Sequence, residues 1–170
     1  MPQLPKETVR AILGQESEIP AARAWARRRQ LDLAYDEEAL TLRLAMTGPS
    51  AISNSEPEPY LLLASFEDYD VLPPIWRFVD PRGGAVIGQA AYPKPTGASV
   101  LHSNGLICAP WSRLAYAVHG GPHNDWGVLN AWKTAAPTSS HALTIPDMLN
   151  RIVREVRQSC GRMAPLPAVP

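Results

Sequence analysis

The chain has 170 residues, and its 16 Lys and Arg residues balance its 16 Asp and Glu residues, so that it carries no net charge at neutral pH. This length suits one domain with a core of its own, and a neutral chain has no overall field that would attract nucleic acid or an anionic membrane surface. We therefore expect one domain over residues 1–164, a proline-rich tail over residues 165–170, and neither nucleic acid nor membrane as a partner.

Cysteine usage and the first residues favour a cytoplasmic protein. The chain has two cysteines, Cys108 and Cys160, which are too few for a disulfide framework. Residues 1–10 lack the apolar run of a signal peptide, and the longest apolar runs are too short to span a bilayer. A reducing cytoplasm is therefore the expected location.

Two helices are predicted before the first strand. Over residues 5–13, Val9, Ile12 and Leu13 share one helical face, and a second helix is expected over residues 20–30. The second helix carries a basic face made of Arg23, Arg27, Arg28 and Arg29. Such a run is typical of a solvated helix surface, and docking of an acidic partner is the alternative.

Three strands of a meander are predicted next. Residues 40–46 alternate apolar and polar side chains with period two, which indicates a half-buried strand, and residues 60–66 predict a more fully buried one. Residues 75–79 predict a third strand after segment 67–74, whose prolines favour an extended backbone. Residues 85–98 are expected to be irregular and exposed.

The clearest helix closes the domain. Thr144 can cap it, Asp147 stands at the capping-box position, and Pro146 lies in the first turn. An apolar stripe follows before Gly161, made of Leu149, Ile152, Val153, Val156 and Cys160, so that Cys160 is expected in the core. The order of an N-terminal helix, an antiparallel β-meander, a cysteine-bearing loop and closing C-terminal helices predicts an α+β fold.

The other cysteine lies where a nucleophile could be held rigidly. Asn104 and Gly105 can adopt positive φ and reverse the chain, and the apolar pair 106–107 can then be anchored in the core. Cys108 would thus lie where the core meets a loop, which suits a reactive thiol. The alternative is that Cys108 is a small buried hydrophobic residue, as most free cysteines are.

Three histidines and one aspartate are candidates to support Cys108. His102 can lower the pKa of the thiol or orient its loop, and Asp125 can orient or deprotonate an incoming amine. His119 and His123 are four residues apart, but Gly120, Gly121 and Pro122 between them argue against a helix that would align them. A zinc site from His102, Cys108, His119 and His123 matches no strong metal motif, so that no metal or other cofactor is expected. The remaining aromatic residues of this stretch are expected in the core: Trp111, Trp126 and Trp132.

Three segments, in the same order as in the family, resemble the ubiquitin-conjugating enzymes of the kind found in bacterial operons for antiphage defence. Residues 69–78, with Tyr-Asp-Val-Leu-Pro-Pro followed by Ile-Trp-Arg-Phe, are similar to the tyrosine-to-Pro-Pro segment and the strand after it. Residues 103–108, Ser-Asn-Gly-Leu-Ile-Cys, are similar to the Asn-Gly-x-Ile-Cys sequence that ends on the catalytic cysteine. Residues 142–152 are similar to the start of the helix that follows the active site.

The resemblance implies a ubiquitin-conjugating fold and a thioester carrier. Cys108 would accept the C-terminus of a ubiquitin-like or other protein from an adenylating enzyme and pass it to an amine of a target protein. The family's His-Pro-Asn motif has no counterpart here except in residues 101–104, which makes Asn104 the candidate for its oxyanion role. The link from Cys108 to the closing helix is also longer, and its insertion, with His119, His123, Asn124 and Asp125, can supply what the missing motif does not.

Two alternatives remain open at this stage. The missing motif suggests a catalytically silent relative that binds a ubiquitin-like protein or scaffolds a complex. A Cys/His hydrolase that uses Cys108 with His119 or His123 is the other alternative.

Overall fold

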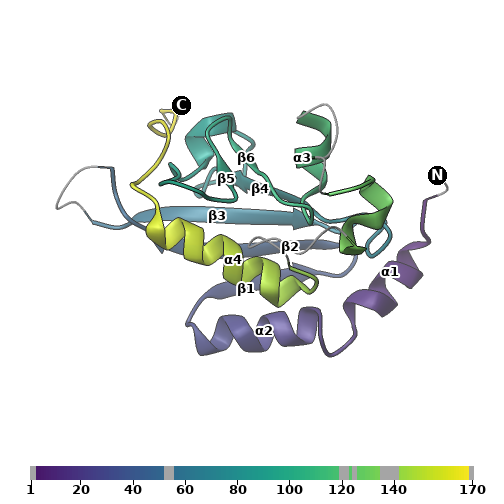
Figure 1. The fold of residues 1–170 in the computed structure, drawn as a ribbon. Helices are drawn as coiled ribbons and strands as arrows, with labels where there is room; N and C mark the ends of the chain where they lie inside the picture. The colour runs from purple at the N-terminus through teal and green to yellow at the C-terminus, as the bar shows by residue number, and fades with distance from the viewer. Residues whose placement is uncertain (1–2, 52–55, 119–122, 124–125, 135–141, 169–170) are drawn as a thin grey trace.

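The structure is a computed structural model, which describes residues 3–51, 56–118, 123, 126–134 and 142–168. Its elements follow the chain in this order: α1 (Lys6–Leu13), α2 (Ile19–Arg28), β1 (Asp32–Asp36), β2 (Thr41–Gly48), β3 (Glu58–Ser65), β4 (Ile75–Val79), the 3₁₀ helix η1 (Gly88–Ala91), β5 (Leu101–His102), β6 (Leu106–Ile107), α3 (Arg113–Val118), the 3₁₀ helix η2 (Leu129–Thr134) and α4 (Ile145–Gln158). The predicted α+β class is confirmed, since helices pack on an antiparallel sheet (Figure 1).

The main sheet has four antiparallel strands in the order β1-β2-β3-β4, where three were predicted. The strand that the sequence analysis missed is β1, which pairs with β2 from Asp32 opposite Ala45 to Asp36 opposite Thr41. No residue of β1 is fully buried, and an aspartate stands at each end. This composition is typical of a protected edge strand, and it explains why the hydrophobic pattern is weak there.

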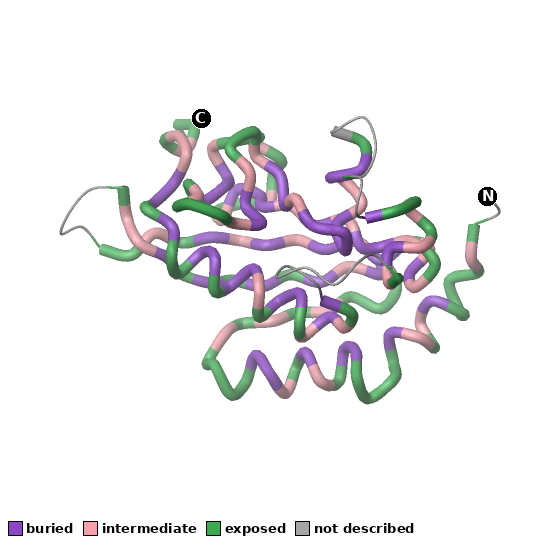
Figure 2. Tube along the Cα trace, in the orientation of Figure 1, coloured by how far each residue is buried: buried purple, intermediate pink, exposed green. Residues whose placement is uncertain are grey.

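Burial on β2 follows the predicted alternation, because Leu42, Leu44 and Met46 are buried and the residues between them face outward. The expectation of a more fully buried strand at residues 60–66 was wrong. Strand β3 also alternates, with Tyr60, Leu62 and Ala64 buried and its other face only half-buried. Both strands therefore turn one face to the same core, as expected for an antiparallel sheet with one covered side. Figure 2 shows buried and less buried residues alternating along the sheet.

Helices α2 and α4 lie side by side and contact β1 and β2, respectively (Figure 1). The predicted cap of α4 is present, since the Thr144 hydroxyl accepts a hydrogen bond from the Asp147 amide at 3.4 Å and donates one to Oδ2 of Asp147 at 2.7 Å. The helix ends at Gln158, two residues before Cys160. The expectation of a buried Cys160 was therefore wrong, because the side chain lies beyond the helix and is exposed. After the cysteine loop, the described part of the chain forms α3, the 3₁₀ helix η2 and α4, of which α4 is the longest.

A buried carboxylate joins the two covering helices. Glu18 stands at the N-cap position of α2, is 5% exposed, and accepts a hydrogen bond from the Ile145 amide of α4 at 3.0 Å through its side chain. Burial raises the pKa of Glu18 above its ordinary value. The beginning of α4 is thus held both by its own Thr144 cap and by a residue 127 positions earlier in the chain.

The two segments around β4 differ from expectation. Residues 67–72 form turns, with the Leu72 amide donating to the Asp68 carbonyl at 2.9 Å, so that the extended backbone predicted from the prolines was wrong there. The segment 85–98 is not exposed throughout, because Ala91, Tyr92 and Pro93 are buried. Tyr92 packs against Phe78 of β4 with ring centroids 5.2 Å apart, which pulls this segment onto the sheet.

Candidate active site around Cys108

A short hairpin places Cys108. Strands β5 and β6 pair Leu101 with Ile107 and His102 with Leu106, and a three-residue turn over 103–105 joins them. The turn has φ +78° at Gly105, so that only one residue of the predicted Asn-Gly pair adopts a positive φ. A three-residue loop with glycine at its left-handed last position is a common hairpin connection. The predicted chain reversal is therefore confirmed, but the positive φ expected at both Asn104 and Gly105 is present only at Gly105.

Cys108 follows directly on this hairpin. Its amide donates to the Val100 carbonyl at 2.7 Å, which continues the hairpin ladder, while Leu106 and Ile107 before it are buried. The Cys108 side chain itself is half-buried and packs against a small apolar cluster of Leu106, Ala115, Tyr116 and Trp126. The predicted position at the boundary of core and loop is therefore confirmed, and burial raises the pKa of the thiol.

His123 lies beside the thiol. Its Nε2 atom is 3.4 Å from Sγ of Cys108, a distance at which a proton can pass between sulfur and imidazole. The His123 side chain is exposed on one side, and its ring contacts the Trp126 indole with centroids 4.4 Å apart and planes inclined by 50°. The structure thus brings together two of the sequence-predicted site residues, which are 15 positions apart in the chain.

Trp126 is fixed by its own contacts. Its amide donates to the His123 carbonyl at 2.8 Å, and its ring lies 5.5 Å from that of Tyr116 on α3. The Tyr116 hydroxyl in turn donates to the Pro110 carbonyl at 3.2 Å. Trp126 was expected only as a core residue, and it is indeed 6% exposed, but its contact with His123 was missed. The available signal was an aromatic residue three positions after a histidine in a turn-rich stretch.

His102 and Asn104 pair with each other at the turn. Nδ1 of His102 donates to Oδ1 of Asn104 at 2.7 Å, and the Gly105 amide donates to the His102 carbonyl at 3.0 Å. The register places His102 and Cys108 on the same face of the hairpin. These contacts assign His102 and Asn104 to the shape of the turn that carries Cys108.

The other expected residues of the insertion, His119, Asn124 and Asp125, lie outside the described residues. Within the ranges that the structure describes, no three His, Cys, Asp or Glu side chains gather as a metal ion would require. The described part of the arrangement is therefore a thiol and an imidazole in contact, half-shielded by aromatic rings. Such a pair can form a thiolate and then a covalent acyl intermediate.

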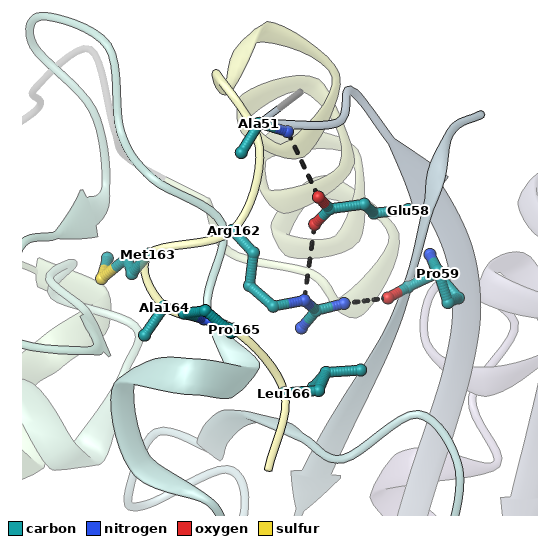
Figure 3. A pocket seen from close by; sticks show the side chains of 8 residues that line it. All are labelled: Ala51, Glu58, Pro59, Arg162, Met163, Ala164, Pro165 and Leu166. Atoms are coloured by element: carbon teal, nitrogen blue, oxygen red, sulfur yellow. Dashed lines mark hydrogen bonds and ion pairs between the residues drawn. The ribbon is translucent and has the colours of Figure 1, made fainter. Parts of the chain in front are cut away.

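A separate pocket of about 400 Å³ lies between β3 and the C-terminal segment (Figure 3). Its polar groups are engaged by the fold. Arg162 donates to the carbonyls of Pro59, Ala90 and Ala91, and its Nε lies 3.4 Å from Oε2 of Glu58. Oε1 of Glu58 accepts from the Ala51 amide at 3.2 Å. We infer that these contacts of Arg162 and Glu58 hold the C-terminal segment against the sheet.

The basic face predicted on the second helix is exposed on α2, and Arg29 stacks on Trp25 and donates to Asn150 of α4 at 3.0 Å. Arg29 and Asn150 line a pocket to which Arg154 and Arg157 of α4 also contribute. Among the described residues, no helix is long and apolar enough to cross a membrane.

No protein-family model and no curated protein matches this chain.

Proposed function

We propose that the chain is a transferase of the ubiquitin-conjugating type that carries the C-terminus of a ubiquitin-like or other protein as a thioester on Cys108. The contact between Sγ of Cys108 and Nε2 of His123 carries this proposal, since it gives the thiol a base within reach. The three ordered sequence segments support it, and the antiparallel sheet flanked by helices is compatible with the family's fold.

The proposed chemistry has two steps. The Cys108 proton passes to His123, and the thiolate attacks the activated acyl carbon presented by an adenylating enzyme, whose own leaving group departs as the new carbon–sulfur bond forms. A target amine then attacks that thioester, an amide bond forms, and the Cys108 sulfur leaves and regains a proton. Because thioesters are already activated, the second step requires orientation and loss of one amine proton rather than an elaborate base.

In this proposal His123 supplies the base, which is a different role from the oxyanion stabilisation that the resemblance ascribes to the missing His-Pro-Asn motif. Asn104, the candidate carried over from that motif, accepts a hydrogen bond from His102 within the turn. We therefore assign Asn104 to the shape of the cysteine loop, and we place the base function on the insertion that bears His123.

A non-reducing gel of the protein expressed with its neighbouring genes in its native host tests the proposal. Wild type and Cys160→Ala should show a band heavier by one small protein that disappears with a thiol reductant. Cys108→Ala should lack the band, and Cys108→Ser should give a band that resists reductant, because an oxygen ester replaces the thioester. Absence of the band from wild type would shift the assignment to the silent binding module.

The same contact between Cys108 and His123 favours a second candidate, a Cys/His hydrolase that cleaves an isopeptide or thioester. The two candidates differ in what they need. A hydrolase turns over a ubiquitin-like thioester or isopeptide substrate with water and without an adenylating partner, whereas the transferase is charged only with that partner. Acyl-probe labelling of Cys108 that depends on His123 but yields no turnover favours the transferase.

A further inference from the structure

We propose that Trp126 is a positioning residue that stabilises the protonated ring of His123 through its indole face and thereby favours the Cys108 thiolate. This inference deepens the proposed function, because it names what regulates the reactivity of the same site, and it rests on Cys108 being the nucleophile. It follows from three contacts: sulfur to imidazole, imidazole to indole, and indole to phenol.

The geometry suits an interaction between a cation and an aromatic face. The centroids of the His123 and Trp126 rings are 4.4 Å apart, within the roughly 6 Å over which a cation is attracted to a ring face, and indole is the strongest of the natural faces. The neutral imidazole gains less from this contact than the imidazolium does. Trp126 therefore favours the state in which the proton has left Sγ of Cys108 and resides on Nε2 of His123.

The environment of Cys108 disfavours its thiolate. Burial opposes ionisation of Cys108, so that a thiolate there depends on a positive partner. Two charged or titratable side chains that the structure describes on the neighbouring elements make contacts within the fold. Arg113 of α3 donates to the carbonyls of Pro73 and Glu67, and His102 of β5 donates to Asn104.

Trp126 is held rigidly enough to act in this way. Tyr116 packs against it, and the Tyr116 hydroxyl is anchored on the Pro110 carbonyl, two residues after Cys108. A continuous chain of contacts thus runs from the thiol of Cys108 through the imidazole, the indole and the phenol, and it returns to the cysteine loop at Pro110. Movement of Trp126 would displace the His123 ring from the sulfur.

The rate of Cys108 alkylation by iodoacetamide, measured from pH 5 to 10 on Cys160→Ala protein, tests the inference without any acyl donor. Trp126→Leu should be three- to tenfold slower at pH 7, with its rate profile displaced to higher pH. Trp126→Phe, which keeps an aromatic face, should lose no more than about threefold. Val128→Ala is the control, because Val128 lies on the same segment and is 63% exposed.

A double-mutant cycle separates charge stabilisation from packing. In a His123→Gln background, Trp126→Leu should leave the alkylation rate unchanged, because there is no imidazolium to stabilise. An equal slowing in both backgrounds, or none in either, would overturn the inference. Circular dichroism checks the fold, and where Trp126→Leu does not fold, the same cycle with Trp126→Met, which also removes the aromatic face, decides. If the alkylation rates depend on Trp126 and His123 as stated but the gel shows no thioester-linked band, this inference stands and the proposed function is refuted.

Discussion

Replacement of Gly161 by alanine should destabilise the fold strongly, because the backbone of another loop occupies the place of the new methyl group. Gly161 has φ +94°, and a Cβ built there would lie 2.1 Å from the Ala51 nitrogen and 2.5 Å from its Cα. Neither atom belongs to a flexible side chain, so that one of the two segments has to move.

The cost can be worked from the contacts that such a movement breaks. Positive φ alone costs an alanine about 1 kcal/mol. Displacement of Gly161 also weakens the pairing of the C-terminal segment with residues 92–94, where the Lys94 amide donates to the Gly161 carbonyl and the Cys160 and Met163 amides donate to the carbonyls of Lys94 and Tyr92. At about 1 kcal/mol for each hydrogen bond, Gly161→Ala should lose about 3 to 5 kcal/mol of unfolding free energy.

Gly97→Ala is the matched control. Gly97 also has positive φ, at +62°, but a Cβ there meets nothing within 4 Å. Its substitution should cost only the conformational term of about 1 kcal/mol. Urea unfolding followed by circular dichroism measures both variants, and the difference of about 2 to 4 kcal/mol corresponds to roughly 5 to 15 °C in Tm. Equal unfolding midpoints for the two variants would refute the steric argument.

Three further predictions concern the site and the core. His123→Gln should slow Cys108 alkylation at pH 7 by about tenfold, since a half-buried thiol without its base is mostly protonated, whereas His102→Ala should change the rate less than threefold; similar losses in both would contradict the assignment of the base. Because burial raises the folded-state pKa of Glu18, the stability that its protonated form contributes is full below the ordinary pKa and is lost as pH rises through the folded-state pKa. The urea midpoint of Glu18→Gln relative to wild type should therefore increase from about pH 4 to pH 7, and a difference independent of pH would refute this. Thr144→Ala should lose about 1 kcal/mol of unfolding free energy and Thr144→Ser much less, as thermal unfolding would show; equal losses would mean that the hydroxyl cap of α4 does not matter.

Local sequence patterns determined much of the fold. The stripe from Leu149 to Val156 and the Thr144 cap define α4, and the alternation of Leu42, Leu44 and Met46 defines β2, because each pattern depends only on neighbours one turn or two residues away. The Asn-Gly turn and the buried pair after it likewise positioned Cys108 at the edge of the core.

Local sequence patterns did not predict the elements whose structure depends on contacts with residues far away in the chain. Strand β1 forms because β2 offers it an edge, although its own residues are at most half-buried. Cys160 continues the apolar spacing of α4, but the helix ends at Gln158, and the following residues pair with Lys94 instead. Propensity at the end of a helix yields to such long-range hydrogen bonds.

The pairing of Cys108 with His123 was decided by the tertiary structure alone. The sequence identified both residues as candidates, together with His102, His119 and Asp125, and could not rank them, because the residues between Cys108 and His123 carry no period that fixes their separation in space. Among the candidates that the structure describes, His123 lies 3.4 Å from the sulfur, and its ring contacts Trp126, which packs against Tyr116 on α3. The sequence thus determined which chemical groups are present, and the packing of distant aromatic residues determined which of them meet.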